Sequence, residues 1–586
     1  MVKLSVLVTF CNQKEYVGRA LDSILMQKTD FDYEVLIGLD GADDGSEEII
    51  RQYMDKYDFI RLYKMSFSKM DTINIEKASW NRKSLLEKAT GEFFTILDGD
   101  DFYGDERKFQ KQIEVLNKYP KCIGCGCSHK VCFSNGKIED KRSFPYFIIY
   151  QLSDYIRKKV YIHNGAIIFR NIFYFGFPLD FPHNFVNDTT LTMYMMKFGQ
   201  LACLPDSMYM YYVYSGGIYQ GVSSADKDLY GAVAAEVNLR CLPEYREELL
   251  HKYHELFYRV YHNRKKYKRK GLAVVREFAA RNGCRFVKAV LDCAVGGFFG
   301  KRIARYRCKH MLKHNDFVGQ TKVRNMGCFT VFSNFGDMLN LYIARYVYGW
   351  NVLPVWENVD VWCIGSVLAR LFEDEVEQGK VVDVVGTGLH RELSKPENFS
   401  TKVRVHSLRG KLSFEKLSKL LSIKKNIVLA DPGILVRRMA DKSKVQNEGR
   451  IGVIPHYYDK DSEYLKNIKV PNLKIIKTED SPIQVMRDIL SCKCVLSSSL
   501  HGLIVADALG VPNRRIVLSD KIIGGDLKFD DYYSVYFDKA EDAPVTIDLR
   551  KETIDEKNID TIIENYVNLE DKMEEQCKAL LKIKIN

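Results

Sequence analysis

Three carboxylates stand within four residues where an apolar run ends, in the stretch FFTILDGDDFYG. At this spacing Asp98, Asp100 and Asp101 repel one another, and each raises the pKa of the others unless a positive charge lies among them. Mg²⁺ or Mn²⁺ would supply that charge, because both prefer hard oxygen ligands and bring phosphate groups with them. A solvated acidic turn is the alternative, since Asp and Gly are also common turn residues.

The surrounding sequence predicts that these carboxylates lie at the edge of a sheet. The runs LSVLVTF, YEVLIGLD, FIRLY and EFFTIL alternate with helical patterns, among them EYVGRALDSILMQ and a helix around residues 81–88. Such alternation predicts a mostly parallel sheet, which binds ligands at the carboxyl ends of its strands. Polar residues follow the other predicted strands as well, namely Thr9, Asn12, Asp40 and Asp44. Their convergence on one edge favours a binding site over an isolated acidic turn.

Strand and helix patterns alternate again from about residue 322. The expected strands are CFTVF, VDVWCIGS, KVVDVVGTG, IVLADPG, RIGVIPH, LKIIKTE and CKCVLSSS. Two successive sets, before and after about Gln446, predict two doubly wound lobes. The expected fold class is therefore α/β throughout, with helices connecting its two halves. The expected domains are 1–225, a helical basic connector 226–318, 319–545 and a helical tail 546–586.

Positive charge is concentrated in one segment of this 586-residue chain, whose formal net charge is +11. Residues 259–313 hold 17 lysines and arginines against Glu277 and Asp292, a local charge of +15. A basic helix with an apolar face suits an anionic membrane surface, and a solvated pair of connecting helices explains the pattern equally well. We expect no nucleic-acid partner, because no nucleic-acid-binding motif accompanies the charge.

The sequence carries no apolar run long enough to span a bilayer, and its first apolar run is too short for a secretion signal. We therefore expect a cytoplasmic protein, with residues 259–313 in peripheral contact with the inner face of the membrane. The 15 cysteines predict free thiols rather than a disulfide framework. The crowded stretch KCIGCGCSHKVC favours buried cysteines in a strand over a zinc site, which needs a distant second ligand pair.

Four stretches of the N-terminal part together resemble family-2-type glycosyltransferases of the GT-A fold. They are VLVTFCNQKEYVGRALDSILMQ, YEVLIGLDGADDGS, SWNRKSLLEKATGEFFTILDGDDFY and NDTTLTMYMMKFGQLACLPDSMYMYY. The resemblance implies transfer of a sugar from a nucleotide-diphosphate donor with inversion, and a Mg²⁺ or Mn²⁺ cofactor. It implies metal binding by Asp100 and Asp101. It implies nucleotide-sugar binding by Thr9, Asn12, Asp40, Asp44, Asn81, Asp98 and Asp100.

An inverting transfer also needs a base for the acceptor hydroxyl. By the resemblance that base is Asp188, at the start of an apolar helix where the dipole keeps a carboxylate ionised. A helix N-cap is the alternative role, and it is compatible with catalysis. The chain departs from the family at Asn187, where an acidic residue is common, and in YMYYVYSGG, where an Arg and a His usually follow the Tyr.

The C-terminal half resembles the polysaccharide pyruvyltransferases. The motifs that carry the resemblance are NFGDMLN, IGS, VGTG, SLRGKLS, ADPG, IPHY, SSSLHGLIVADALGVP and KFDDYY. They imply a GT-B-like fold and a phosphoenolpyruvate donor, whose pyruvate becomes a ketal on two hydroxyls of a glycan sugar. By this resemblance His501 and Arg409 are catalytic. The residues implied for the pyruvyl donor and acceptor are Asn334, Asp337, His456, Tyr457, Ser499 and Lys528, with Ser499 standing where many relatives have Arg.

These observations together predict a bifunctional enzyme of bacterial surface polysaccharide biosynthesis, of the exopolysaccharide or capsule type. The expected acceptor is a glycan or a lipid-linked oligosaccharide. One alternative is a single-activity glycosyltransferase whose C-terminal half binds glycan without catalysis. The other is a membrane-associated scaffold without chemistry.

Overall fold

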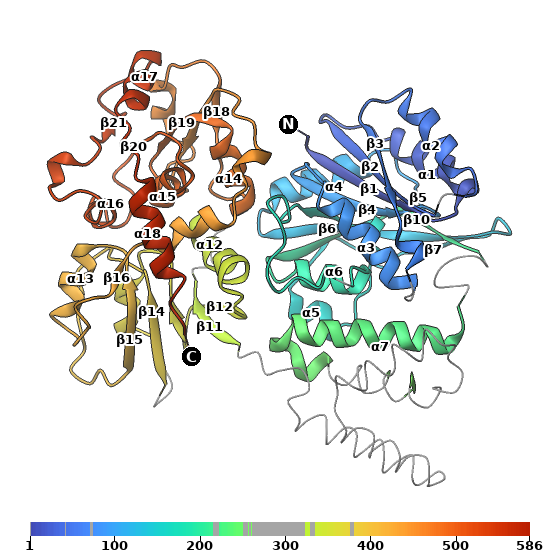
Figure 1. The fold of residues 1–586 in the computed structure, drawn as a ribbon, viewed down its shortest axis with the longest axis horizontal. Coiled ribbons are helices and arrows are strands. Elements are labelled where there is room, and N and C mark those ends of the chain that lie inside the picture. Colours follow the sequence, from blue (N-terminus) through green and yellow to red (C-terminus); the bar gives the residue numbers. More distant parts are fainter. Residues whose placement is uncertain are drawn as a thin grey trace, which may run out of the picture. The chain divides into compact units, whose positions relative to one another are not determined.

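The computed structural model describes residues 2–41, 43–70, 74–183, 185–214, 222–249, 256, 259–260, 323–328, 334–374 and 380–585. Most of the basic segment 259–313 lies outside these residues, and so does the expected membrane contact. The chain divides into two compact units (Figure 1). One comprises Met1–Tyr174 and Phe181–Lys322, and the other Phe175–Asp180 and Val323–Asn586. No helix among the described residues has the length and apolar character to cross a bilayer.

The first unit is built on a ten-stranded mixed sheet in the order β3-β2-β1-β4-β9-β6-β10-β5, with β7 on β6 and β8 on β10. Its strands are β1 (Leu4–Phe10), β2 (Tyr33–Asp40), β3 (Ile60–Met65), β4 (Phe93–Asp98), β5 (Phe102–Tyr103), β6 (Cys122–Phe133), β7 (Ile138–Lys141), β8 (Ile148–Tyr150), β9 (Ile168–Arg170) and β10 (Gln200–Val213). The four strands β3-β2-β1-β4 are parallel, as the alternating pattern predicts. All seven residues of β1 are buried, which fits a central strand covered on both faces.

The register of these parallel strands brings polar residues to one edge of the sheet. Thr9 of β1 pairs with Gly38 of β2 on one side and with Asp98 of β4 on the other. Asp40 ends β2 two residues later. The carboxyl ends of three neighbouring strands therefore meet where the sequence predicts a binding site.

Helices cover the sheet of the first unit. They are α1 (Lys14–Leu25), α2 (Ser46–Met54), α3 (Asn74–Leu86), α4 (Lys108–Lys118), α5 (Leu152–Arg157), α6 (Asp188–Met195) and α7 (Ser224–Cys241). In α1 the residues Val17, Ala20, Leu21 and Ile24 recur at the spacing of one helix face and are all buried. The helix predicted around residues 81–88 begins earlier, at Asn74.

The second unit contains two parallel sheets, one before and one after residue 446, as the sequence predicts. The first lobe has the order β12-β11-β13-β14-β15-β16, and the second β18-β17-β19-β20-β21. The strands are β11 (Arg324–Gly327), β12 (Val352–Val355), β13 (Val361–Trp362), β14 (Val381–Val385), β15 (Lys402–Leu408), β16 (Val428–Leu429), β17 (Arg450–Ile454), β18 (Leu473–Ile475), β19 (Cys492–Ser497), β20 (Asn513–Val517) and β21 (Ile547–Asp548). The strand expected at CFTVF begins at Cys328, one residue after β11 ends, and its other residues lie outside the described ones.

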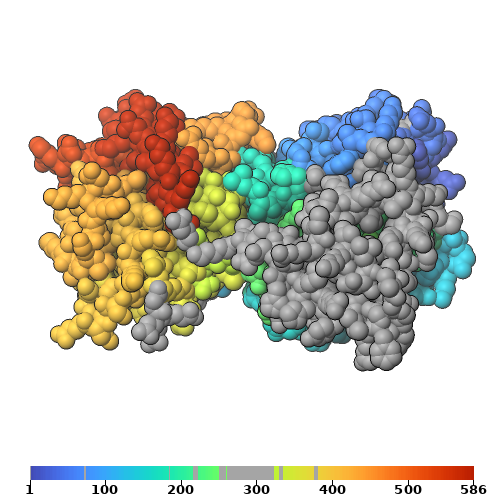
Figure 2. All heavy atoms as spheres, turned by 60° about the horizontal axis from the view of Figure 1, so that its bottom comes forward, coloured from blue at the N-terminus to red at the C-terminus, as the bar shows by residue number. Residues whose placement is uncertain are grey.

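The helices of the second unit pack between and around these sheets. They are α12 (Phe335–Ile343), α13 (Lys411–Ser418), α14 (Pro482–Leu490), α15 (Leu500–Leu509), α16 (Leu527–Tyr533), α17 (Glu556–Glu564) and α18 (Glu570–Leu580), with the short 3-10 helix η7 (Pro432–Arg438). α17 contributes Ile559 and Ile562 to the core of the second lobe. α18 contacts β16 and η7; Figure 1 shows this red helix beside the yellow first lobe, and Figure 2 shows red atoms next to yellow ones. The C-terminal helices are therefore part of this unit.

The cysteine-rich stretch forms β6. Cys122, Cys125, Cys127 and Cys132 are buried there, and none of the described cysteines forms a disulfide. The described residues contain no group of three metal-ligating side chains. The prediction that these cysteines are buried in a strand is confirmed.

Candidate active sites

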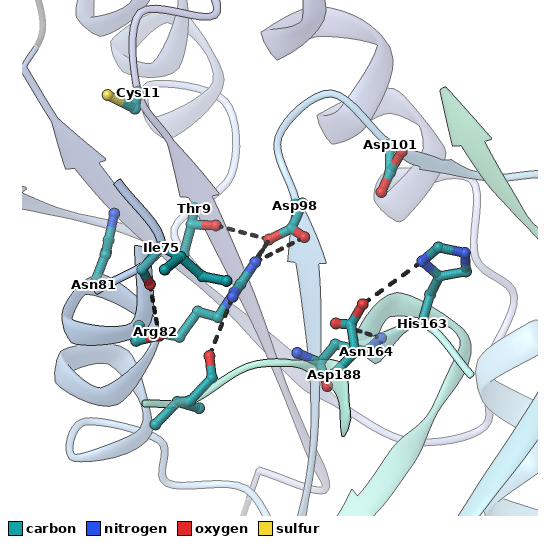
Figure 3. Close-up of polar contacts among 12 residues, drawn as sticks. Thr9, Cys11, Ile75, Asn81, Arg82, Asp98, Asp101, His163, Asn164 and Asp188 are labelled. Atoms are coloured by element: carbon teal, nitrogen blue, oxygen red, sulfur yellow. Dashed lines mark hydrogen bonds and ion pairs between the residues drawn. The ribbon is translucent and has the colours of Figure 1, made fainter. Parts of the chain in front are cut away.

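Arg82 supplies the positive charge that the acidic cluster of the first unit requires. Its Nη2 lies 2.7 Å from Oδ1 and 2.9 Å from Oδ2 of Asp98, and its Nε lies 3.2 Å from Oδ1 (Figure 3). The hydroxyl of Thr9 also donates to Oδ1 of Asp98, at 3.2 Å. Thr9 and Asp98 thus lie together as predicted. The positive charge beside them is the guanidinium of Arg82, which the sequence reasoning missed.

The position of Arg82 in its helix is the signal that could have revealed it. Arg82, Leu85 and Leu86 lie at the i, i+3, i+4 spacing of one helix face, and all three are buried. An arginine on the buried face of a helix needs a carboxylate partner, because an unpaired buried charge is costly. The nearest acidic strand end in the sequence is Asp98.

Asp101 is buried, and β10 supplies a hydrogen-bond donor to each of its carboxylate oxygens. Its Oδ1 accepts a hydrogen bond from the Tyr212 amide at 2.8 Å, and its Oδ2 accepts one from the Tyr209 hydroxyl. Burial, together with the charges of Asp100 and Asp98, raises its pKa well above the ordinary value. Asp101 thereby attaches the acidic loop to β10.

Asp100 is the carboxylate of the cluster that fits a divalent cation. Burial and the neighbouring charge of Asp98 raise its pKa to about 6, so a cation beside it would relieve an existing repulsion. Its backbone carbonyl accepts a hydrogen bond from Arg19 Nη2 at 2.8 Å. Arg19 in turn lies over the rings of Phe102 and Tyr212, at 4.6 and 4.0 Å from their centroids, which fixes the loop.

Asp40 and Asp44, two further predicted donor-site residues, hold neighbouring segments in place around the same strand ends. Asp40 accepts a hydrogen bond from the Ser68 amide at 2.9 Å. Asp44 accepts from the amides of Lys14 at 2.9 Å and Ser46 at 3.0 Å, and so links the starts of α1 and α2.

Two further donor-site candidates are Asn12, which has an unusual backbone conformation, and Asn81, whose side chain is hydrogen-bonded within the protein. Asn12 has a positive φ of 51°, a conformation that Asn adopts more readily than most residues. Asn81 donates to the carbonyl of Gly38 at 2.9 Å and is buried between α3 and β2. Asn81 therefore fastens this helix to the sheet through its Nδ2, while its Oδ1 is buried without a hydrogen-bond partner among the described residues.

Asp188 is held at the head of α6 by groups from a different part of the chain. The Tyr161 hydroxyl donates to Oδ2 at 2.7 Å, and the Asn164 amide donates to Oδ1 at 3.2 Å. His163 Nδ1 lies 3.7 Å from Oδ2 (Figure 3). The N-cap of α6 is Asn187, whose side chain accepts from the Thr190 amide at 2.8 Å. Asp188 is therefore free of the capping role that was its alternative.

The sequence reasoning also missed the aromatic surroundings of Asp188. The ring of His163 stacks on Tyr211 with 4.5 Å between centroids, and burial lowers the pKa of this histidine. Tyr161 is 49% exposed, so it reaches solvent while it binds Asp188. No sequence pattern marks these residues, because they come from a loop and from β10.

In the second unit, the predicted residues at the head of α12 form one polar group. Asn334 caps this helix by accepting from the Gly336 amide at 3.1 Å, and its Nδ2 donates to Asp337 at 3.0 Å. Burial raises the pKa of Asp337 to about 7. Lys528 of α16 interacts electrostatically with Asp337, and burial followed by the charge of Arg409 lowers the pKa of this lysine to about 8.

The two predicted histidines of the second unit belong to the same group. Burial lowers the pKa of both His456 and His501 to about 3, and the positive charge of Lys528 acts on both. The ring of His501 lies against the backbone of Gly336, because a Cβ on that glycine would be 2.3 Å from Nδ1. Tyr457 stacks beside His456, with 4.3 Å between ring centroids. Helices α12, α15 and α16 therefore bring the sequence-predicted residues together.

Arg409 lies close to this group but is fully enclosed. Its three guanidinium nitrogens donate to Asp531 at 3.0 Å, Ser366 at 2.7 Å and the Leu389 carbonyl at 2.6 Å. It is 0% exposed, so it provides a fixed positive charge and does not present a fork to a ligand. Ser499 is also buried, and its backbone amide donates to the Ser497 hydroxyl at 3.0 Å.

Asp431 is the residue of this region that the sequence reasoning did not single out, although it lies in the ADPG motif. Its Oδ1 accepts from the Gly433 amide at 2.8 Å, and its Oδ2 lies 4.0 Å from Nε2 of His501. Burial raises its pKa to about 6. A buried carboxylate that follows a strand and precedes Pro-Gly is the signal that the motif offered.

Comparison with known families gives two matches within the chain. The model of the family described as "Glycosyl transferase family 2" matches residues 5–177, and that described as "Polysaccharide pyruvyl transferase" matches residues 369–520. The uncharacterized protein Rv1520 of Mycobacterium tuberculosis is 28% identical over 218 residues, which are 37% of this chain and 60% of that protein. The chain thus spans less than two thirds of that relative.

Two further similarities also concern part of the chain. The uncharacterized protein L143 of Acanthamoeba polyphaga mimivirus is 30% identical over 217 residues, 35% of this chain and 71% of that protein. The structure of S. aureus TarS 1–349 in complex with UDP-GlcNAc is 18% identical, with a TM-score of 0.36, and covers 54% of this chain and 93% of its own. By its two family matches, this chain joins a member of glycosyl transferase family 2 to a member of the polysaccharide pyruvyl transferase family.

Proposed function

We propose that the chain is a bifunctional transferase of bacterial surface polysaccharide biosynthesis. Its first unit transfers a sugar from a nucleotide-sugar donor with inversion, and its second transfers pyruvate from phosphoenolpyruvate as a ketal. The acceptor of both is a glycan, lipid-linked in the proposed setting, and residues 259–313 provide the membrane contact. The domain boundaries proposed for this arrangement are 1–225, 226–318, 319–545 and 546–586.

One contact supports the first activity above all others, and it involves Arg82. Its Nη1 donates to the Val186 carbonyl at 3.1 Å, two residues before Asp188, while its Nη2 binds Asp98. The donor side and the acceptor side of an inverting transferase must lie close together, because the acceptor oxygen attacks the carbon that the diphosphate leaves. Asp188 accepts the proton of the acceptor hydroxyl in this proposal.

A divalent cation fits the donor side through Asp100. When bound, Mg²⁺ or Mn²⁺ would neutralise the diphosphate as it departs. Asp98 is already paired with Arg82 and Asp101 with β10, so Asp100 is the protein ligand we assign to the cation. Thr9 and Asp98 lie at the same edge of the sheet.

A screen of donors tests the first activity. The full chain would be incubated with a panel of nucleotide-diphosphate sugars, Mn²⁺ and lipid-linked intermediates extracted from bacterial membranes, and nucleotide release would be measured. We expect release with one donor class, dependent on the extract and lost on chelation. Absence of release with every donor, from a chain that is folded by circular dichroism, would remove the proposal for this unit.

The second activity needs cations for an anionic donor and a group that moves protons. One sugar hydroxyl adds to the central carbon of phosphoenolpyruvate while the methylene carbon gains a proton. The second hydroxyl then displaces phosphate, and the bond between carbon and the phosphate oxygen breaks. Of the two hydroxyl protons, one ends on the new methyl group and the other leaves with inorganic phosphate.

Lys528 and His501 are the residues we assign to these two tasks. Lys528 is 7% exposed, lies near Asp337 and Arg409, and forms no ion pair with the described residues. A buried ammonium without a paired carboxylate attracts an anionic ligand. His501 lies in the first turn of α15, where backbone N–H groups also favour an anion, and burial keeps its imidazole neutral, with a lone pair on one ring nitrogen.

Phosphate release tests the second activity and separates it from its rival. The full chain would be incubated with phosphoenolpyruvate and a glycan acceptor, and inorganic phosphate would be measured for the wild type and His501→Ala. We expect release that depends on the acceptor and is lost in the variant. Glycan binding without phosphate release would instead support a non-catalytic glycan-binding module.

A further inference from the structure

Two buried polar atoms without partners face each other in the second unit. Nε2 of His501 and Oδ2 of Asp431 are both shut off from solvent, and neither has a hydrogen-bond partner among the described residues. They lie 4.0 Å apart. Each buried polar atom without a hydrogen bond lowers the stability of the folded protein. One hydrogen bond between Oδ2 of Asp431 and Nε2 of His501 would remove both penalties.

The surroundings of the two side chains determine which nitrogen can do chemistry. His501 turns Nε2 toward Asp431, while its Nδ1 lies at Gly336, beside the head of α12 where Asn334 and Asp337 are grouped. Asp431 is held in turn by the Gly433 amide, which binds its other oxygen at 2.8 Å. The Gly433 amide therefore holds Oδ1 of Asp431, and Oδ2 points toward the imidazole of His501.

We propose that Asp431 is a positioning residue for His501: its Oδ2 accepts a hydrogen bond from Nε2–H, which leaves the lone pair of Nδ1 facing the polar group at α12. The two atoms need to approach by about 1 Å to reach hydrogen-bond distance. Such bonds are often long in a free enzyme and shorten when substrate binds. The proposal rests on the proposed pyruvyl transfer for its function, but the hydrogen bond itself does not.

A capping role for Asp431 makes a different prediction. As the N-cap of η7, it needs only an acceptor oxygen for Gly433, and Asn supplies one. Asp431→Asn keeps that acceptor and turns an amide N–H toward Nε2, which favours the opposite tautomer of His501. Asp441→Asn is the matched control, because Asp441 caps the 3-10 helix Lys442–Lys444 in the same way through the Ser443 amide.

The tautomer of His501 can be measured without any substrate. The full chain would be labelled with ¹⁵N-histidine, and the signal of His501 would be identified by its loss in His501→Gln. We expect the Nε2–H tautomer in the wild type and in Asp441→Asn, and its loss in Asp431→Asn. An Nδ1–H tautomer in the wild type, or an unchanged His501 signal in Asp431→Asn, would overturn the proposal.

Kinetics then tests whether the contact serves the reaction. For phosphate release from phosphoenolpyruvate, we expect Asp431→Asn to lower kcat by about 10²- to 10⁴-fold, the range of a displaced acid–base group, with a smaller change in KM. Equal kcat in Asp431→Asn and Asp441→Asn would overturn the positioning role. If the wild type releases no phosphate with any acceptor, the proposed pyruvyl transfer fails, and the tautomer measurement still decides on the Asp431–His501 contact.

Discussion

A single nitrogen of Arg82 lies within hydrogen-bond distance of both carboxylate oxygens of Asp98, at 2.7 and 2.9 Å. The guanidinium is almost enclosed, with its side chain 10% exposed, whereas the carboxylate is 33% exposed. Loss of either partner would leave a charge in a poorly solvated place, which costs more than the pair itself contributes. The pair therefore determines the stability of the donor edge as well as its charge.

Removal of the Arg82 charge should destabilise the first unit. We expect Arg82→Met to lower the free energy of unfolding by about 2–3 kcal/mol, because Asp98 loses its partner, and Arg82→Met with Asp98→Asn to recover part of that loss. Calorimetry of the four proteins of this cycle measures the coupling. Lys83→Met is the control, since the Lys83–Glu87 pair is of the surface type, worth about 0.3–0.5 kcal/mol. Equal effects of Arg82→Met and Lys83→Met would contradict the prediction.

Asp100 and Asp101 should differ in their effect on metal-dependent nucleotide binding. We expect Asp100→Asn to abolish the Mn²⁺ dependence of nucleotide binding, because it removes the assigned ligand. Asp101→Asn should lower the melting temperature and preserve the Mn²⁺ dependence, because its oxygens bind Tyr209 and Tyr212. Titration calorimetry with and without chelator distinguishes the two variants, and loss of Mn²⁺ dependence in Asp101→Asn alone would reverse the assignment.

Binding of the cation should also depend on pH. The pKa of Asp100 is raised from 3.8 to about 6, so below pH 6 the carboxyl is protonated and Mn²⁺ affinity should fall about tenfold per pH unit. In the metal-free protein the sign is opposite. The folded chain holds this proton more tightly than the unfolded chain, so Asp100 lowers stability as the pH rises from about 4 to 6. Mn²⁺ affinity that is constant between pH 5 and 7 would count against Asp100 as the ligand.

The neighbours Asn187 and Asp188 should separate capping from catalysis. Asn187→Ala removes the N-cap of α6 and should cost about 1 kcal/mol of stability with kcat for sugar transfer unchanged. Asp188→Asn should lower kcat by about 10²- to 10⁴-fold with little change in melting temperature. The two variants are each other's control. A full rate of sugar transfer in Asp188→Asn would show that the base lies elsewhere.

Lys108 should be a source of instability that substitution can remove. It is 0% exposed, its Nζ has no hydrogen-bond partner among the described residues, and it lies 4.5 Å from the Tyr103 ring centroid. We expect Lys108→Met to raise the free energy of unfolding by about 1–2 kcal/mol, or the melting temperature of the first unit by about 2–8 °C.

The pH dependence of the free energy of unfolding is a second test of the burial of Lys108. Burial lowers its pKa from 10.5 to about 8, so between these values the unfolded chain binds the proton and the folded chain does not. Wild-type stability should therefore gain from Lys108 as the pH rises from 8 to 10.5. Lys108→Met should lose this gain, and an identical pH dependence in both proteins would contradict the burial of a neutral amine.

A methyl group at Gly336 should disturb His501. A Cβ there would lie 2.3 Å from Nδ1 and 2.8 Å from Cγ of the imidazole, so the ring must move. We expect Gly336→Ala to lower phosphate release at least tenfold. Gly18→Ala in α1 is the control, because its nearest atom is the Tyr53 hydroxyl at 3.6 Å and helix propensity favours Ala. Unchanged phosphate release in Gly336→Ala would argue against a role for the placement of His501.

The parallel strands could be predicted from the sequence because their signals are local. The runs LSVLVTF and YEVLIGLD became β1 and β2 residue for residue, since buried parallel strands consist of continuous apolar residues. β15 carries Lys402, Arg404 and His406 on alternate positions, and that polar alternation concealed a strand that lies between β14 and β16.

The partners within each site could not be predicted because they depend on distant parts of the chain. Asp101 binds Tyr209, which follows it by 108 residues, and nothing near Asp101 indicates which strand will lie beside it. The same holds for Tyr161 on Asp188 and for Asp431 opposite His501. Residue types at strand ends revealed where chemistry is expected, and only the packing revealed which oxygen atoms remain free for it.

The hydrogen bond from Arg82 to the Val186 carbonyl has a mechanical consequence. It spans 104 residues of sequence and makes α3 a brace between two loops that serve different substrates. A substitution that displaces the loop before α6 should therefore change the binding of the nucleotide-sugar donor as well as the binding of the acceptor. An enzyme evolved for a new acceptor would therefore need compensating substitutions at the donor loop and at the acceptor loop.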